Sequence, residues 1–190
     1  MDDAHILPAR HKLDVAVYHR MAEACLFGPE ERIELIEGDL IDMAPIGQGH
    51  AAIVTGLTGA LVMACAGRAL VSPQNPIRLD RTSEPQPDFA VLRRRADMYA
   101  TGERPGPADV LLLIEVADSS LRFDRTVKLP LYARAGIAEY WIVDLGRRVV
   151  DVYRVPDGGA YREMTTHTTG DRIALTLAPE IVVTLDLVFG

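Results

Sequence analysis

The stretch VLLLIEV at residues 110–116 decides the fold of this chain. A continuous apolar run of this length predicts a strand that is buried on both faces and lies centrally in a sheet. Only Glu115 interrupts the run. An ionised carboxylate in such surroundings costs several kcal/mol to desolvate unless a cation, a metal ion or strong donors meet it. Glu115 is therefore the first candidate for a functional residue.

Helices are predicted before and after this strand in the sequence. Apolar residues recur at helical spacing over about 14–25, 50–65 and 125–135. Gly28-Pro29 follows the first helix as a stop signal, and Gly136 follows the third as a C-cap. Pro130 must lie near the first turn of the third helix or bend it.

Strands make up most of the remaining pattern. Runs rich in Ile and Leu at 32–37 and 39–44, joined by Glu37-Gly38, predict a hairpin in which Glu37 is a turn residue. Further strands are predicted at 69–72, 76–80, 88–92, 138–144, 148–155, 161–165, 172–175 and 181–185. The predicted fold class is α/β, with a central mixed β-sheet flanked by helices and a β-rich C-terminal part.

The composition bounds the class of protein. The 190 residues are 48% hydrophobic and 25% charged, which predicts one globular domain over residues 1–190. The longest weakly polar stretch, 52–67, falls short of the roughly 20 apolar residues that cross a bilayer. The first sixteen residues hold no apolar core of signal-peptide length. We therefore expect a cytoplasmic protein with no membrane partner.

Charge and cysteine usage narrow the chemistry. The net charge of −7 argues against broad non-specific attraction to nucleic acid, although it does not exclude a local basic groove. Eighteen basic residues are arginines, so Lys12 and Lys128 are the two candidates wherever lysine chemistry is needed. Cys25 and Cys65 cannot form a zinc cluster by themselves, and their apolar helical contexts predict buried thiols.

A second carboxylate accompanies Glu115. Asp88, in QPDFAVL (86–92), also lies at the edge of an apolar strand, and neighbouring strands would bring the two acids together. Mg²⁺ typically binds one or two such oxygens plus waters. If the third helix folds back over the strand, its first turns present the Lys128 ammonium to the same place. A metal-activated water beside a cation is the chemistry of phosphodiester hydrolysis.

The chain resembles the PD-(D/E)XK nuclease superfamily, and within it a large bacterial family of restriction-endonuclease-like proteins of undefined function. The resemblance runs in order, with family-like spacing, through IELIEGDLIDMAP (33–45), His50, QPDFAVL (86–92), LLIEVADSS (112–120) and KLPLYARAGIAEYWIVD (128–144).

This resemblance implies a restriction-endonuclease-like core with a defined site. Glu34, Asp88 and Glu115 would hold Mg²⁺ or Mn²⁺, and Lys128 would position the attacking water. The standard pattern of the superfamily has its lysine two residues after the acid, where this chain has Ala117. The similar family carries its lysine on the following helix, which fits Lys128. DNA is the expected substrate and a homodimer the expected assembly, because nucleases that cut both strands often pair their sites.

Other interpretations of the site residues remain open at this point. Asp88 alone is typical of a turn or cap. Glu115 could pair with a buried arginine, for which Arg122 and Arg125 are available. Lys128 could extend along an amphipathic helix face to solvent. His50 fits a structural hydrogen bond as well as a substrate contact.

The residues around the motifs leave further alternatives. The alternation of the first hairpin strand does not decide which face of it, and hence whether Glu34, is buried. Arg93-Arg94-Arg95 could touch phosphates or form a solvated charge run. Tyr132, Tyr140 and Trp141 are predicted to pack in the core. The alternative functions are a catalytically inactive binding or dimerisation module of the same fold and, third, a metal-dependent phosphohydrolase of small substrates.

Overall fold

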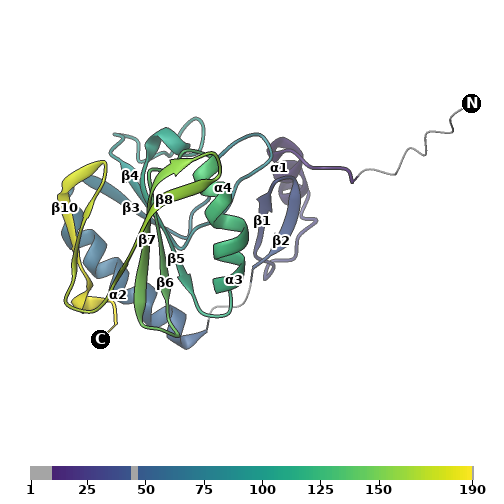
Figure 1. The fold of residues 1–190 in the computed structure, drawn as a ribbon. Coiled ribbons are helices and arrows are strands. Elements are labelled where there is room, and N and C mark those ends of the chain that lie inside the picture. Colours follow the sequence, from purple (N-terminus) through teal and green to yellow (C-terminus); the bar gives the residue numbers. More distant parts are fainter. Residues whose placement is uncertain (1–9, 44–46, 190) are drawn as a thin grey trace, which may run out of the picture.

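The computed structural model describes residues 10–43 and 47–189, so the predicted hairpin end at Ala44 and motif end at Pro45 lie outside the described residues. Its centre is a six-stranded mixed sheet in the order β3-β4-β5-β6-β7-β8 (Figure 1). β5 and β6 are parallel, and the other neighbours are antiparallel. The strands are β3 (Ala69–Pro73), β4 (Phe89–Arg93), β5 (Val110–Ala117), β6 (Glu139–Asp144), β7 (Val149–Asp157) and β8 (Ala160–His167). The predicted fold class is confirmed.

The strand β5 is the buried centre that its sequence predicts. Every residue from Val110 to Ala117 is buried, and β5 is hydrogen-bonded between β4 and β6. Alternation along the strand separates two cores. Leu112, Ile114 and Val116 pack into one core, whereas Leu113 and Ala117 pack into the other. Glu115 has the same parity as the second set and therefore faces the second core.

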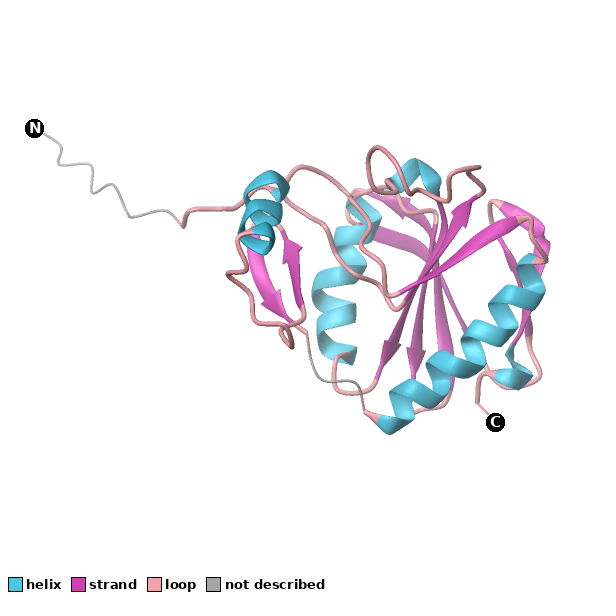
Figure 2. Cartoon of the chain, turned by 180° about the vertical axis from the view of Figure 1, so that it is seen from behind, coloured by secondary structure: helices cyan, strands magenta, loops and turns pink. Residues whose placement is uncertain are grey.

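One face of the sheet is covered by α2 (Gln48–Cys65) and the C-terminal strands β9 (Arg172–Leu175) and β10 (Ala178–Thr184), followed by the 3-10 turn η3 (Leu185–Leu187). Figure 2 shows α2 crossing this face. By length and composition alone, α2 could span a membrane, since its 18 residues have a mean hydropathy of 1.3. Leu57, Ala60, Leu61 and Cys65 are its buried residues. The absence of a membrane partner therefore stays a prediction.

The opposite face carries a helical segment over 121–134, and the hairpin of β1 (Ile33–Ile36) and β2 (Asp39–Asp42) lies beside it with α1 (Val15–Glu23) (Figure 1). The segment consists of α3 (Leu121–Phe123), the π segment η2 (Asp124–Lys128) and α4 (Leu129–Arg134).

The third helix begins four residues earlier than predicted, and its irregularity at Pro130 is confirmed. It begins at Leu121 and includes a π turn, in which the Leu129 N–H donates to the Asp124 carbonyl. Pro130 supplies the physical reason. It has no N–H to donate to the carbonyl four residues earlier, and its ring would clash with that carbonyl in a regular helix. Gly136 closes the helix with φ at 76°, as predicted.

Two other predictions are wrong. Residues 76–80 form no strand, although Ile77 and Leu79 are buried. The Ile77 and Arg78 N–H groups donate to the carbonyls of Pro85 and Pro105, and prolines cannot return such bonds to form a ladder. Cys25 is exposed rather than buried, because α1 ends at Glu23 and Cys25 adopts a left-handed φ of 54°. The short 3-10 turn η1 (Pro107–Asp109) leads into β5.

The Glu37-Gly38 turn is confirmed. Both residues have positive φ, 49° and 79°, as the two-residue turn of a hairpin requires. A Cβ at Gly38 would come within 2.7 Å of the Lys12 Cβ, so the position also needs glycine for space. This turn sets the register of β1, in which Glu34 pairs with Ile41.

Candidate active site

The four residues predicted to form a site line one cavity of about 320 Å³. Glu34 comes from β1, Asp88 directly precedes β4, Glu115 lies in β5, and Lys128 ends the π segment. All four are buried. Residues from four separate parts of the sequence therefore meet in one place.

The Lys128 ammonium lies between two of the carboxylates. Its Nζ is 3.0 Å from Glu115 Oε1 and 3.2 Å from Glu34 Oε1. The Lys128 side chain is only 4% exposed, so it does not extend to solvent. The other lysine, Lys12, pairs with Asp39 at the surface. Lys128 is therefore the lysine of the site.

The small residue at position 117 is compatible with a lysine that arrives from the helix. Ala117 lies two residues beyond Glu115 on the same strand face, and it packs in the core beneath the helical segment. Lys128 instead reaches Glu115 from the helical segment that covers this face.

Glu34 is held in place from its other oxygen. The Gln86 N–H donates to Glu34 Oε2 at 2.9 Å. Three successive residues of β1 are buried: Glu34, Leu35 and Ile36. Both faces of this hairpin strand are therefore buried. Glu34 thus joins the loop before β4 to Lys128.

Asp88 is fixed by two contacts to the same oxygen. The Val116 N–H donates to Asp88 Oδ2 at 2.8 Å, and His50 Nε2 lies 3.1 Å from this oxygen. Burial raises the pKa of Asp88, but the hydrogen bonds from His50 and Val116 outweigh it, and the net pKa is lowered. Asp88 is therefore an ionised carboxylate, and His50 is one of its hydrogen-bond partners.

Carboxylates outnumber cations in this cavity. Burial lowers the pKa of Lys128, but the charges of Glu115, Glu34 and Asp124 outweigh that effect and raise it above its ordinary value. Burial raises the pKa of Glu115, and Lys128 offsets only part of that rise. Lys128 is charged, and the surrounding acids exceed what one ammonium can neutralise.

Sequence reasoning missed three residues of the site. Asp124 is buried and lines the cavity, and it accepts a 2.7 Å hydrogen bond from Ser120 Oγ. The Tyr132 hydroxyl donates to Glu115 Oε1 at 2.8 Å. Ser120, Asp124, Lys128 and Tyr132 recur at intervals of four along the sequence. This spacing places Ser120 and Asp124, and likewise Lys128 and Tyr132, on one side of a regular turn, and that was the signal that could have found them. How the two pairs are placed relative to each other depends on the π turn between Asp124 and Lys128, which the spacing does not reveal.

The donor set fits a hard divalent cation in kind, because carboxylate oxygens are the ligands that Mg²⁺ and Mn²⁺ prefer. In the arrangement described, no three acidic, histidine or cysteine side chains among residues 10–43 and 47–189 surround a common metal position. The oxygens of Glu34 and Glu115 converge on the Lys128 ammonium instead. The same oxygens are the ones that would hold an ion.

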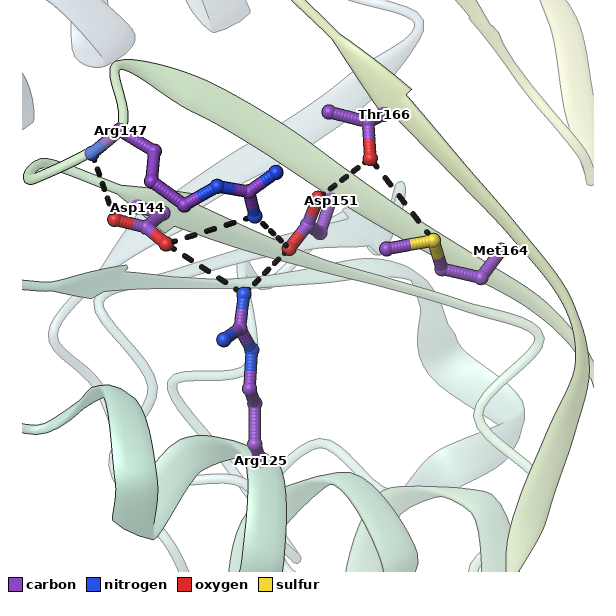
Figure 3. Close-up of polar contacts among 6 residues, drawn as sticks. All are labelled: Arg125, Asp144, Arg147, Asp151, Met164 and Thr166. Atoms are coloured by element: carbon purple, nitrogen blue, oxygen red, sulfur yellow. Dashed lines mark hydrogen bonds and ion pairs between the residues drawn. The ribbon is translucent and has the colours of Figure 1, made fainter.

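The predicted alternative of a buried arginine for Glu115 is wrong, since Lys128 and Tyr132 are its partners. Arg125 turns to a separate cluster, shown in Figure 3, where it contacts Asp151 at 2.7 Å and Asp144 at 3.5 Å. Tyr132, Tyr140 and Trp141 are fully buried, as predicted.

The arginine run after β4 is placed away from the site. Asp88 precedes β4, and Arg93 is its last residue, so the run begins at the opposite end of the strand. Arg93 and Arg94 donate to the carbonyls of Ala108 and Gly67, and Arg95 pairs with Asp97. These contacts favour a structural role over contact with phosphate at this cavity.

Comparisons with known proteins agree with this geometry. The sequence model of the Uma2 family, described as "Putative restriction endonuclease", matches residues 15–187. Among curated proteins, no sequence matches this chain. A crystal structure of "a putative nuclease belonging to DUF820" from Anabaena variabilis superposes with a TM-score of 0.65 at 17% identity, over 89% of this chain and 96% of that one.

This structural likeness shows a nuclease-like fold, and it confirms the fold that the motifs imply. The family match covers all four predicted site residues and supports a nuclease-like function. Because the matched region spans most of the sequence, the chain belongs to the Uma2 family of restriction-endonuclease-like proteins.

Proposed function

We propose that the protein is a divalent-metal-dependent endonuclease that hydrolyses DNA phosphodiester bonds. One observation carries the proposal: Glu34, Asp88, Glu115 and Lys128 line a single cavity although they come from distant parts of the sequence. Buried carboxylates in excess of cations are costly unless a further cation or a proton binds them, and a divalent ion is such a cation. A nuclease-like family and fold support the same conclusion.

The roles follow from the contacts. Glu34, Asp88 and Glu115 would hold Mg²⁺ or Mn²⁺, which when bound lowers the pKa of a water and offsets charge on the phosphate. The Lys128 ammonium orients the attacking water or meets the negative charge that develops on the phosphate. His50 and the Val116 N–H fix the Asp88 carboxylate in its ionised form.

The test is metal-dependent cleavage of plasmid DNA by the purified protein. We expect nicking with Mg²⁺ or Mn²⁺ and none with a chelator. Glu115→Gln is expected to lower the cleavage rate by more than about 100-fold, because the metal contributes several kcal/mol of transition-state stabilisation. Asp118→Asn is the matched control, since Asp118 lines the same cavity but is exposed. Full activity of Glu115→Gln would refute the assignment.

A catalytically inactive binding or dimerisation module is the second candidate. The observation in its favour is that Lys128 already pairs with Glu34 and Glu115, as it would in a purely structural cluster. Calorimetry with Mn²⁺ separates the two. A nuclease is expected to bind Mn²⁺ and to lose that heat in Asp88→Ala, whereas the inactive module shows no binding that depends on Asp88. The homodimer and the cytoplasmic location stay predictions from the sequence.

A further inference from the structure

Lys128 and a divalent ion would require the same oxygens. The ammonium contacts Oε1 of both Glu34 and Glu115. Glu115 Oε1 also accepts the Tyr132 hydroxyl, so it already has two donors. The two lone pairs of Glu115 Oε1 are therefore both engaged, and an ion can coordinate this oxygen only where one of the donors leaves. If an ion binds there, the ammonium has to give up at least one of its two partners.

A displaced ammonium needs another carboxylate close by. Its side chain is 4% exposed, and a buried charge without a partner is strongly destabilising. Asp144 and Asp151 are not available for this purpose, because Arg125 and Arg147 pair with them. The ammonium must therefore find its partner within the cavity.

Asp124 meets these requirements. Its carboxylate is 2% exposed, lines the same cavity and lies one helical turn before Lys128. Its hydrogen-bond donor is the Ser120 hydroxyl, which is neutral and does not compensate the charge. No contact within ion-pair distance joins Asp124 to Lys128 in the described part of the chain, yet each influences the pKa of the other. Both residues belong to the π segment and line the same cavity, so Asp124 is the buried acid of this segment that a displaced ammonium would meet.

The backbone between these two residues is the π segment η2, with the wider hydrogen bond from Leu129 to the Asp124 carbonyl. Pro130 donates no hydrogen bond in the next position. π segments of this kind are frequent at functional sites. Here the segment places both the acid and the lysine over the cavity.

We infer that Asp124 is the positioning residue that receives the Lys128 ammonium when a divalent ion takes the oxygens of Glu34 and Glu115. The inference rests on the proposed function. Lys128 thus has two sets of partners, Glu34 and Glu115 without the ion and Asp124 with it. Asp124 thus holds the ammonium beside the reaction site without binding the ion itself.

A double-mutant cycle in Mn²⁺ affinity, measured by calorimetry on the full chain, tests this. In the protein with Lys128, Asp124→Asn is expected to weaken Mn²⁺ binding about ten- to hundredfold, because the displaced ammonium then lacks a charged partner. In the Lys128→Gln background, Asp124→Asn is expected to change the affinity by less than about twofold. Asp118→Asn, at the exposed rim, is the matched control and should have the same small effect in both backgrounds.

The outcomes separate the inference from the proposed function. Equal weakening by Asp124→Asn in both backgrounds would make Asp124 a direct ligand and overturn the inference alone. No weakening in either background would overturn it as well. Failure of the wild-type protein to bind Mn²⁺ would overturn the proposed function and the inference together.

A second measurement does not depend on the folding of the Lys128→Gln variant. Lysine-selective ¹⁵N labelling gives two side-chain signals, from Lys12 and Lys128. Adding diamagnetic Mg²⁺ is expected to shift the Lys128 signal, to leave that of Lys12 in place, and to produce a different end position in Asp124→Asn. Mg²⁺ binding with an unmoved Lys128 signal, or with the same end position in Asp124→Asn, would contradict the inference.

Discussion

Two charged clusters lie on one row of the sheet and differ in their balance of charge. Glu115 pairs with Ile142 across β5 and β6, and Ile142 pairs with Asp151 across β6 and β7. The same π segment supplies a cation to each acid, Lys128 to Glu115 and Arg125 to Asp151. The buried Ile142 side chain separates them. The two clusters thus share their scaffold.

Their compositions are nonetheless different. In the second cluster Arg125 and Arg147 face Asp144 and Asp151, two cations for two acids, as Figure 3 shows. The cavity is lined by four buried acids, Glu34, Asp88, Glu115 and Asp124, and Lys128 is the buried cation among its lining residues, since Arg32 is only partly buried. A balanced cluster needs nothing more, whereas a surplus of buried carboxylates is stable only with a further cation or proton. The surplus, rather than the burial, distinguishes the candidate active site.

The largest expected loss of stability comes from removing the lysine of the cavity, and the matched comparison removes Arg125 from the second cluster. Without divalent metal, Lys128→Met should lower the free energy of unfolding by about 3–5 kcal/mol, because it leaves several buried acids without a cation. Arg125→Met should cost only about 1 kcal/mol, since Arg125 is 36% exposed and Arg147 remains as a partner. Urea unfolding measures both. Added Mn²⁺ should restore stability to Lys128→Met alone, and equal losses in the two variants would remove the distinction between the clusters.

A smaller change in the free energy of unfolding is expected on acidification. The pKa of Asp88 is lowered in the folded protein, so its contribution to stability is full above its ordinary value of 3.8 and is lost as the pH falls through its folded value. Asp88→Asn should therefore cost about 2 kcal/mol near neutral pH. The difference from wild type should stay constant down to about pH 5 and narrow as the pH falls below about 4.

Chemical unfolding over this pH range provides the measurement, and His50→Leu refines it. Because the His50 hydrogen bond is the strongest of the influences that lower the pKa of Asp88, its loss should reduce the pH dependence. A difference between wild type and Asp88→Asn that grows on acidification would contradict the assigned role of His50.

The smallest expected effect compares single hydroxyls. Tyr132 donates to Glu115, and Thr166 donates to Asp151 Oδ1 at 2.8 Å. Tyr132→Phe and Thr166→Val should each lower the free energy of unfolding by about 1 kcal/mol. Only Tyr132→Phe should also alter Mn²⁺ affinity, by calorimetry. A change of affinity in Thr166→Val would show that the two clusters are coupled across Ile142.

Much of the fold could be predicted because burial leaves a strong signal in the sequence. The apolar run of β5, the Glu37-Gly38 turn and the strands after Gly136 all follow local rules of patterning and turn chemistry. The segment 76–80 shows where such rules fail. Ile77 and Leu79 alternate like a strand, but the hydrogen-bond partners of this segment are carbonyls of distant prolines. Local periodicity does not reveal partners of that kind.

The site was predictable to a similar extent. Asp88 and Glu115 attract attention because each is a charge beside an apolar strand, and the family motifs supply Glu34 and Lys128. Asp124 lies between two motifs, next to residues that resemble an ordinary polar helix end, and its burial depends on how the helix packs. Tyr132 looked like a core residue, and it is one, but its hydroxyl also reaches Glu115. Dual roles of this kind are decided by tertiary structure.

The π turn has a consequence for the helix as a whole. Counting along 121–134 with one uniform period assigns wrong directions to side chains on one side of the turn, because the wider turn shifts the phase. Deleting a single residue there would rotate Asp124 by about 100° relative to Tyr132, since each residue of a regular helix advances by that angle. The π turn shifts the direction of the side chains that follow it, and this shift lets one helix contribute side chains to both the cavity and the core.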